Sequence, residues 1–269
     1  MTKEIVIIFA LALVCISATT KKSNPTLYII GDSTVEGGRG NNGLWGWGKF
    51  LPQFFDTTKI SIKNYARGGT SARTFQTNAV PEFMKISRGF WDSVSVKMKK
   101  GDYLIIQFGL NDQGAVNDTA RARGTLHGTG EDSVTIINSL TKKSEVVHTF
   151  GWYMRRFVTQ AKAKGVSVIV CSSIPRNKWE NDKTVRGESG FAGWALQVAN
   201  EEKVFSIDLN SKIADVYDRE GKQAVTDKYH IAKDATHTTE GGALLNASIV
   251  AQEIRGLKNC TLKKYLIDK

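Results

Sequence analysis

The sequence predicts an α/β fold, a three-layer α/β/α sandwich around a five-stranded parallel sheet. Short apolar segments rich in β-branched residues alternate along the chain with longer segments of helical periodicity. Strands that alternate with helices form parallel sheets that are covered on both faces. Because crossovers between parallel strands are right-handed, the helices divide between the two faces. No repeat, low-complexity tract or linker divides the 269 residues.

The predicted strands are five short apolar runs. The first, TLYIIG, stops at Gly31, and the second, ISIKNYA, alternates apolar and polar side chains. The third and fourth, DYLIIQFG and VSVIVCSS, are the uninterrupted apolar runs expected of strands buried on both faces. The five strands are predicted over residues 26–31, 60–66, 102–109, 166–173 and 204–209.

Helical periodicity appears between and after these strands. A long predicted helix ends at Gly165, a residue typical of a helix C-terminus, and Thr239 is a suitable N-cap for the last helix. The irregular segment 111–144 follows the third strand, so we expect it at the carboxyl edge of the sheet, where ligands bind in such folds. The helices are predicted over residues 44–55, 145–165, 190–202 and 239–257.

The first twenty residues have the pattern of a secretory signal peptide. Lys3 precedes an apolar run over 5–16, and small residues follow at 17–20. The run is too short to span a bilayer and no stop-transfer pattern follows it; an uncleaved membrane anchor is the alternative. We therefore expect a signal peptide over residues 1–20, a single domain over residues 21–269, and secretion to the extracellular or periplasmic space without stable membrane association.

Composition narrows the classes of partner. The formal net charge of +11 indicates an acidic partner such as a polyanionic polysaccharide. The basic residues are scattered, which disfavours nucleic acid. Outside the predicted signal peptide only Cys171 and Cys260 remain; Cys171 lies in an apolar run typical of a buried thiol, and whether the two pair is open. No Cys/His cluster has metal-site spacing, so we expect no metal.

Ser33 directly follows the first predicted strand, in the stretch GDST. Two interpretations are open. Asp32 and Ser33 are common caps of a following turn or helix. A serine at the carboxyl end of a parallel strand is also well placed to act as a nucleophile. The second interpretation requires a base, a carboxylate that orients it and donors for an oxyanion.

The segment DATH offers the base. Asp234 lies three residues before His237, so a turn can bring its carboxylate to Nδ1 of the imidazole and leave Nε2 free to accept a proton. Alternatively, Asp234 is a helix-start residue and His237 is incidental. The segment follows the last predicted strand, so it falls at the same sheet edge as Ser33.

Gly69 and Asn111 are the candidate oxyanion donors. Gly69 follows the second strand, where glycine lets a backbone N–H turn into a site. Asn111 follows the third strand and offers a side-chain amide. Both residue types are also common in ordinary turns. Their coincidence with Ser33 and with the Asp234–His237 pair at one sheet edge favours the chemical interpretation.

These motifs resemble the four sequence blocks of the SGNH (GDSL-type) hydrolase superfamily. Within it, the stretches NYARGGTSARTF, FGLND, TFGWY, IPRNKW and DATHTTEGG are similar to the rhamnogalacturonan acetylesterases, carbohydrate esterase family 12. The resemblance extends from Gly31 to Gly242. It implies a flavodoxin-like SGNH hydrolase fold and an esterase without a cofactor that removes O-acetyl groups from acidic pectic polysaccharide.

The resemblance also implies the role of each site residue. Ser33 would be the nucleophile and His237 the general base, oriented by Asp234. The oxyanion hole would consist of the Ser33 N–H, the Gly69 N–H and the Asn111 side chain. The chain departs from the pattern at Leu110, where many relatives carry a polar residue, and in having two cysteines in the body where some relatives carry two disulfides.

Two residues in the loop after the fourth strand are candidates for binding substrate. Trp179 can stack on a sugar ring, and Arg176 can pair with a carboxylate. We expect a monomer that binds an acetylated acidic polysaccharide or oligosaccharide.

Three alternatives remain at this stage. An SGNH lipase or thioesterase would need an apolar cleft, whereas residues 111–130 are polar and charged. An acetylesterase that acts on xylan or another polysaccharide is the second alternative. A non-catalytic polysaccharide-binding protein would be expected to lack a member of the triad, and none is missing. The glycines at 38, 40 and 43 do not join a strand to a helix, which disfavours a dinucleotide site.

Overall fold

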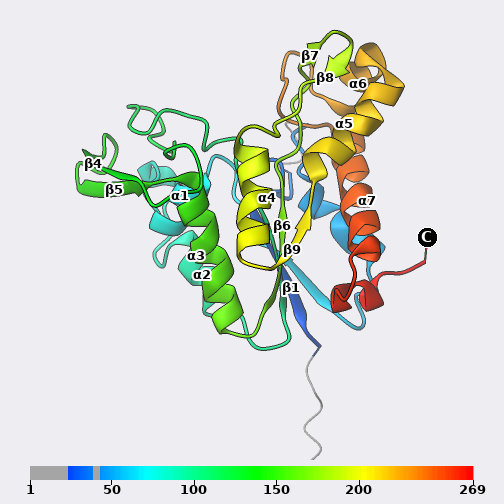
Figure 1. The fold of residues 1–269 in the computed structure, drawn as a ribbon, viewed down its shortest axis with the longest axis horizontal. Coiled ribbons are helices and arrows are strands. Elements are labelled where there is room, and N and C mark those ends of the chain that lie inside the picture. Colours follow the sequence, from blue (N-terminus) through cyan, green and yellow to red (C-terminus); the bar gives the residue numbers. More distant parts are fainter. Residues whose placement is uncertain (1–23, 39–42, 269) are drawn as a thin grey trace, which may run out of the picture.

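A five-stranded sheet in the order β2-β1-β3-β6-β9 forms the centre of the protein, and every neighbouring pair of its strands is parallel. The computed structural model describes residues 24–38 and 43–268. Helices lie on both sides of the sheet (Figure 1), so the predicted three-layer sandwich is confirmed. The strands are β1 (Thr26–Gly31), β2 (Ser61–Asn64), β3 (Tyr103–Gln107), β6 (Ser167–Cys171) and β9 (Phe205–Ile207).

Two hydrophobic cores fill the spaces between the sheet and its helices. Successive side chains of a strand point to opposite faces, so Leu27 and Ile29 of β1 enter one core while Tyr28 and Ile30 enter the other. The first core is closed by α5 (Leu209–Glu220), α6 (Lys222–Tyr229), α7 (Glu240–Gly256) and the 3₁₀ segments η2 (Trp47–Lys49) and η3 (Leu51–Phe54). The second is closed by α1 (Ala72–Thr77), α2 (Phe90–Ser95), α3 (Phe150–Ala163) and α4 (Phe191–Glu201).

The helix predicted over 145–165 is wrong in its first turn. Residues Ser144–His148 form strand β5, which pairs antiparallel with β4 (Ser133–Ile137), and α3 begins only at Phe150. Thr149 caps α3, because its Oγ1 accepts the N–H of Trp152 at 3.2 Å. β-Branched residues at 146 and 147 favour the strand, and Glu145 is fixed there by the buried Arg73, which donates to it from Nε and Nη2.

The single helix predicted over 44–55 is also wrong, since the segment forms η2 and η3 instead. The chain passes too close to its neighbours for a regular helix: a Cβ on Gly46 would lie 2.3 Å from the Glu36 carbonyl oxygen. Pro52 stands at the start of η3, where it starts a new turn.

Several further features complete the fold. The remaining short elements are η4 (Glu82–Met84), η5 (Thr261–Tyr265) and the small antiparallel pair β7 (Trp179–Glu180) and β8 (Lys183–Thr184). Cys171 and Cys260 are both buried and free, so the buried thiol predicted at Cys171 is confirmed. No helix in the described ranges is long and apolar enough to cross a bilayer. The signal peptide predicted over residues 1–20 lies outside the described residues.

Candidate active site

Ser33 lies in a tight turn at the carboxyl end of β1. Asp32 is fully buried, and its Oδ1 accepts the N–H and the hydroxyl of Thr34 at 2.9 and 2.8 Å. Only glycine fits before this turn, because a Cβ on Gly31 would lie 2.7 Å from the Gln107 carbonyl oxygen. Asp32 therefore has the structural role of holding the turn, while the neighbouring Ser33 side chain is left to face His237.

A chain of hydrogen bonds joins Ser33, His237 and Asp234. Ser33 Oγ lies 2.9 Å from His237 Nε2, and His237 Nδ1 lies 2.6 Å from Asp234 Oδ2. With the proton on Nδ1, the imidazole donates to the carboxylate and its Nε2 accepts the serine hydroxyl. The other oxygen of Asp234 accepts the N–H groups of Thr236 and His237 at 2.7 and 3.0 Å, so the turn itself fixes the carboxylate beside the ring.

The pKa values of the two aspartates shift in opposite directions. Burial alone would raise the pKa of Asp234, but the backbone N–H groups of His237 and Thr236 and the imidazole outweigh it, so the pKa is lowered. For the fully buried Asp32, burial dominates over the bonds from Thr34 and raises the pKa. Asp234 is thus the carboxylate that stays ionised beside His237.

Gly69 and Asn111 lie with Ser33 and His237 in the lining of one cavity of about 390 Å³, which we name the serine cavity. Gly69 has φ +83°, a conformation in which any other residue is strained. The Asn111 amide donates to the Thr70 carbonyl oxygen at 2.7 Å, which leaves its second N–H for a ligand. The structure therefore brings all five predicted residues together, and their catalytic roles stay predictions.

Asp112 ties the two donor loops to each other. Its Oδ1 accepts the N–H of Ala72 at the start of α1, and its Oδ2 accepts the N–H of Gly109, both at 3.0 Å. Burial raises the pKa of Asp112 to about 8, against the effect of these N–H donors. This buried side chain keeps the Asn111 loop next to the loop that carries Gly69.

Three arginines that the sequence analysis did not single out also line the serine cavity: Arg67, Arg121 and Arg123. Arg123 donates to the Gly69 carbonyl oxygen at 3.2 Å, and Arg67 lies 3.8 Å from Glu36. Burial and, second, repulsion by Arg121 lower the pKa of Arg123. Two guanidinium groups that repel each other favour an anionic ligand. In the sequence, the Arg-Ala-Arg spacing at 121–123, after the third strand, is the feature that indicates a basic loop at this edge of the sheet.

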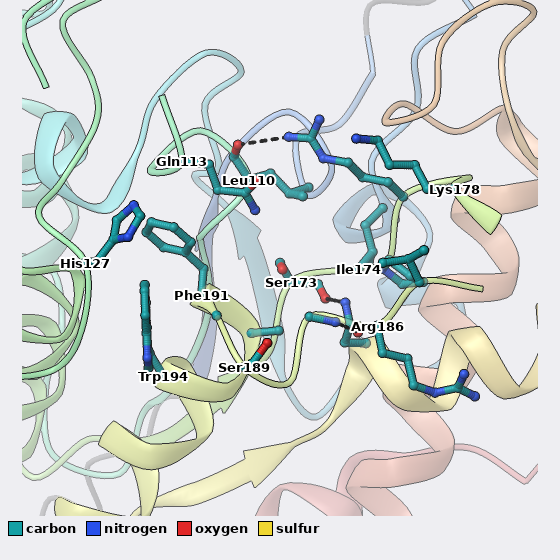
Figure 2. Close-up of a pocket in the computed structure, with 17 residues that line it drawn as sticks. Leu110, Gln113, His127, Ser173, Ile174, Lys178, Arg186, Ser189, Phe191 and Trp194 are labelled. Atoms are coloured by element: carbon teal, nitrogen blue, oxygen red, sulfur yellow. Dashed lines mark hydrogen bonds between the residues drawn. The ribbon is translucent and has the colours of Figure 1, made fainter. Parts of the chain in front are cut away.

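Arg176 and Trp179, the predicted substrate-binding residues, are separated by the structure. Arg176 lines a second cavity of about 520 Å³ (Figure 2). Trp179 lines neither cavity; it lies on β7, packs against the first hydrophobic core and donates from Nε1 to Asn177 Oδ1 at 2.6 Å. Among the described residues no group of three or more His, Cys, Asp or Glu side chains is arranged to hold a metal ion.

A serine, a histidine and an aspartate joined in this way at the carboxyl edge of a parallel sheet match the arrangement that activates a nucleophilic serine in hydrolases. A family model described as GDSL-like lipase/acylhydrolase matches residues 27–250. The chain therefore belongs to this family of carboxylic ester hydrolases, which confirms the SGNH (GDSL-type) resemblance.

Curated relatives are similar over most of the chain. A rhamnogalacturonan acetylesterase of Emericella nidulans is 28% identical over 87% of this chain and 86% of its own length. The rhamnogalacturonan acetylesterase RhgT of Bacillus subtilis is 25% identical over 90% of this chain and 94% of its own length.

Solved structures share the fold. The crystal structure of YxiM from Bacillus subtilis superposes with a TM-score of 0.67 at 25% identity and covers 87% of this chain, while this chain spans 57% of that one. An acetylxylan esterase from Geobacillus stearothermophilus has a TM-score of 0.56 over 92% of this chain and 98% of that chain. At 17% identity this second likeness shows the fold alone.

Proposed function

We propose that the protein is an acetylesterase that removes O-acetyl groups from rhamnogalacturonan through Ser33, His237 and Asp234. The observation that carries the proposal is the Ser33–His237–Asp234 chain of hydrogen bonds inside a cavity that also contains Gly69 and Asn111. The substrate is supported by relatives named rhamnogalacturonan acetylesterase at 25–28% identity.

The proposed reaction has two steps. His237 Nε2 takes the hydroxyl proton as Ser33 Oγ attacks the acetyl carbonyl carbon. The N–H groups of Ser33 and Gly69 and the Asn111 amide stabilise the oxyanion, and each such donor contributes roughly 3–4 kcal/mol in other hydrolases. Collapse of the tetrahedral species breaks the ester bond, and the leaving sugar oxygen receives the proton from His237. Water, activated by the same base, then cleaves the acetyl–Ser33 ester and releases acetate.

The lining of the serine cavity supports an acidic sugar polymer. Arg67, Arg121 and Arg123 offer guanidinium groups that pair with carboxylates such as those of galacturonate. Phe83 borders the same cavity with 83% of its surface exposed, which is the environment of an aromatic ring that stacks on a sugar.

A second candidate is hydrolysis of fatty acyl esters. Leu44, Phe83 and Met84 give the serine cavity an apolar wall that an acyl chain could occupy. Arg67 already faces Glu36, but Arg121 and Arg123 favour the acidic sugar, because an acyl chain would offer them no anionic group.

Acetate release decides between these functions. We expect the wild type, but not Ser33→Ala, to release acetate from acetylated rhamnogalacturonan, and to act more weakly on acetylated xylan and on a long-chain nitrophenyl ester. Activity on the long-chain ester alone would establish the acyl-chain function, and preference for xylan would reassign the polysaccharide. A fully active Ser33→Ala enzyme would overturn the assignment of the nucleophile.

We also propose a secreted monomer, cleaved after about residue 20. The support is the sequence pattern of residues 1–20. N-terminal sequencing of the protein recovered outside the cell, with light scattering for its mass, tests both statements.

A further inference from the structure

The second cavity lies beside the serine cavity at the same edge of the sheet. Leu110 lines the second cavity and the next residue, Asn111, lines the serine cavity, so one peptide unit separates the two. Both cavities are therefore within reach of one extended polymer. At about 520 Å³, against about 390 Å³, the second cavity is the larger, yet it contains none of the five predicted catalytic residues.

The lining of the second cavity has cations and no carboxylates. Its charged side chains are Arg176, Lys178 and Arg186. Asp215 and Asp218 neutralise Arg186 from outside the cavity, at 2.6 and 3.1 Å. The other two cations have no such carboxylate partner among the described residues.

Arg176 has N–H donors without a partner among the described groups, so it can bind a carboxylate. Its Nη2 donates to the Leu110 carbonyl oxygen at 3.3 Å, and its buried Nε has no partner among the described groups. A guanidinium offers five N–H donors in a planar fork that matches a carboxylate. Lys178, exposed near it, adds a second positive charge.

The other side of the cavity is aromatic. Figure 2 shows His127, Phe191 and Trp194 together on the side away from Lys178 and Arg186. Phe191 supports Trp194 edge-on at 4.8 Å between ring centroids, and His127 lies 5.5 Å from Trp194. The half-buried Trp194 ring is therefore held in place with part of its surface open, as a ring that stacks on a sugar must be.

We propose that the second cavity binds another segment of the polysaccharide chain whose acetyl group enters the serine cavity. This segment carries uronate and no acetyl group. Arg176 and Lys178 hold its carboxylate, and one of its sugar rings stacks on Trp194. This inference rests on the proposed function. It predicts that the enzyme recognises several sugars of a chain at once.

Binding to a catalytically inactive protein tests the inference apart from catalysis. In the Ser33→Ala background, calorimetry would measure binding of rhamnogalacturonan oligosaccharides from which alkali has removed the acetyl groups. We expect Lys178→Glu and Trp194→Ala to weaken binding about tenfold each, and Trp194→Phe to retain most of it. Lys258→Glu, an exposed charge reversal just beyond the C-terminus of α7, is the matched control and should bind normally. Oligosaccharides with reduced carboxyl groups should bind weakly to every protein.

The outcomes separate the two proposals. Normal binding by both Lys178→Glu and Trp194→Ala overturns the second-cavity site, even where the wild type deacetylates the polymer. Loss of binding in both variants supports the site. If the wild type then released no acetate from rhamnogalacturonan, that second result would overturn the proposed function but not the second-cavity site. A thermal unfolding curve of each variant verifies that the variant is folded. Because Lys178 is exposed, the Lys178→Glu substitution leaves the core intact.

Discussion

At the scale of single residues, the proposed reaction depends on how Asp234 holds His237. An asparagine at 234 has the same shape, but it presents either an amide N–H or a weaker acceptor to Nδ1, which disfavours the tautomer with a free Nε2. We therefore expect Asp234→Asn to lower kcat for nitrophenyl acetate by roughly 10²–10⁴-fold. Steady-state kinetics together with a thermal unfolding curve measure this effect.

The matched control is Asp132→Asn, which neutralises an exposed carboxylate that lines neither cavity. It should leave both activity and unfolding unchanged. If Asp234→Asn retained wild-type kcat, then Asp234 would be only a turn residue, which is the alternative interpretation of the DATH segment.

The sequence alone identifies those residues of the serine cavity that lie in short motifs at the ends of strands. Asp234 and His237 are three apart, so local spacing sufficed to pair them. Phe83 could not be found in this way, because nothing local shows that its segment folds back over the Gly69 loop. The Arg-Ala-Arg spacing at 121–123 indicates a basic loop after the third strand, but not that this loop reaches the Gly69 loop. The residue type of Trp179 suits a sugar-binding site, yet its side chain packs against the first hydrophobic core and lines neither cavity.

At the scale of elements, the buried Asp112 connects the end of β3 to the start of α1. Asp112→Asn would put an amide group against one of the two N–H donors that the carboxyl now accepts. Since a buried polar group without a partner costs about 1–3 kcal/mol, we expect a comparable loss in the free energy of unfolding, measured in urea. Because Asn111 and Gly69 would also separate, kcat should fall more than KM changes.

Asp92→Asn is a matched control, because Asp92 is an exposed aspartate on α2 away from both cavities. It should change the free energy of unfolding little. A stable Asp112→Asn protein with normal kcat would show that the two loops hold their positions without this connection.

The elements that sequence predicted well are the central ones. All five strands of the sheet are predicted. β1, β3 and β6 are buried on both faces and form uninterrupted apolar runs, whereas β2 and β9 are short and only partly buried. The sequence predicts helix at Ser144–His148, where the structure has a strand, because this segment is half exposed and directly precedes a helical pattern. The helices α1, α2, α5 and α6 were missed, since they are short or begin immediately after strands and caps that interrupt their periodicity.

At the scale of the whole molecule, positive charge should draw the acidic polymer to both cavities. The formal net charge is +11, and removal of residues 1–20 would leave it unchanged because Lys3 and Glu4 cancel. The Debye length falls from about 30 Å at 0.01 M to about 3 Å at 1 M salt. We therefore expect KM for acetylated rhamnogalacturonan to rise about 3–10-fold between these salt concentrations, while kcat and the hydrolysis of uncharged nitrophenyl acetate stay constant.

Two variants locate the origin of this salt dependence. Arg121→Gln removes a cation from the serine cavity and should both raise KM at low salt and flatten its dependence on salt, whereas the distant Lys258→Gln should do neither. If KM rose equally with salt for the polymer and for nitrophenyl acetate, salt would be acting on the enzyme itself. If KM for the polymer did not change with salt, the arginines would not form ion pairs with the carboxylates of the substrate. Because the nitrophenyl ester and the polymer share Ser33 but differ in charge, their ratio reports the charge recognition alone.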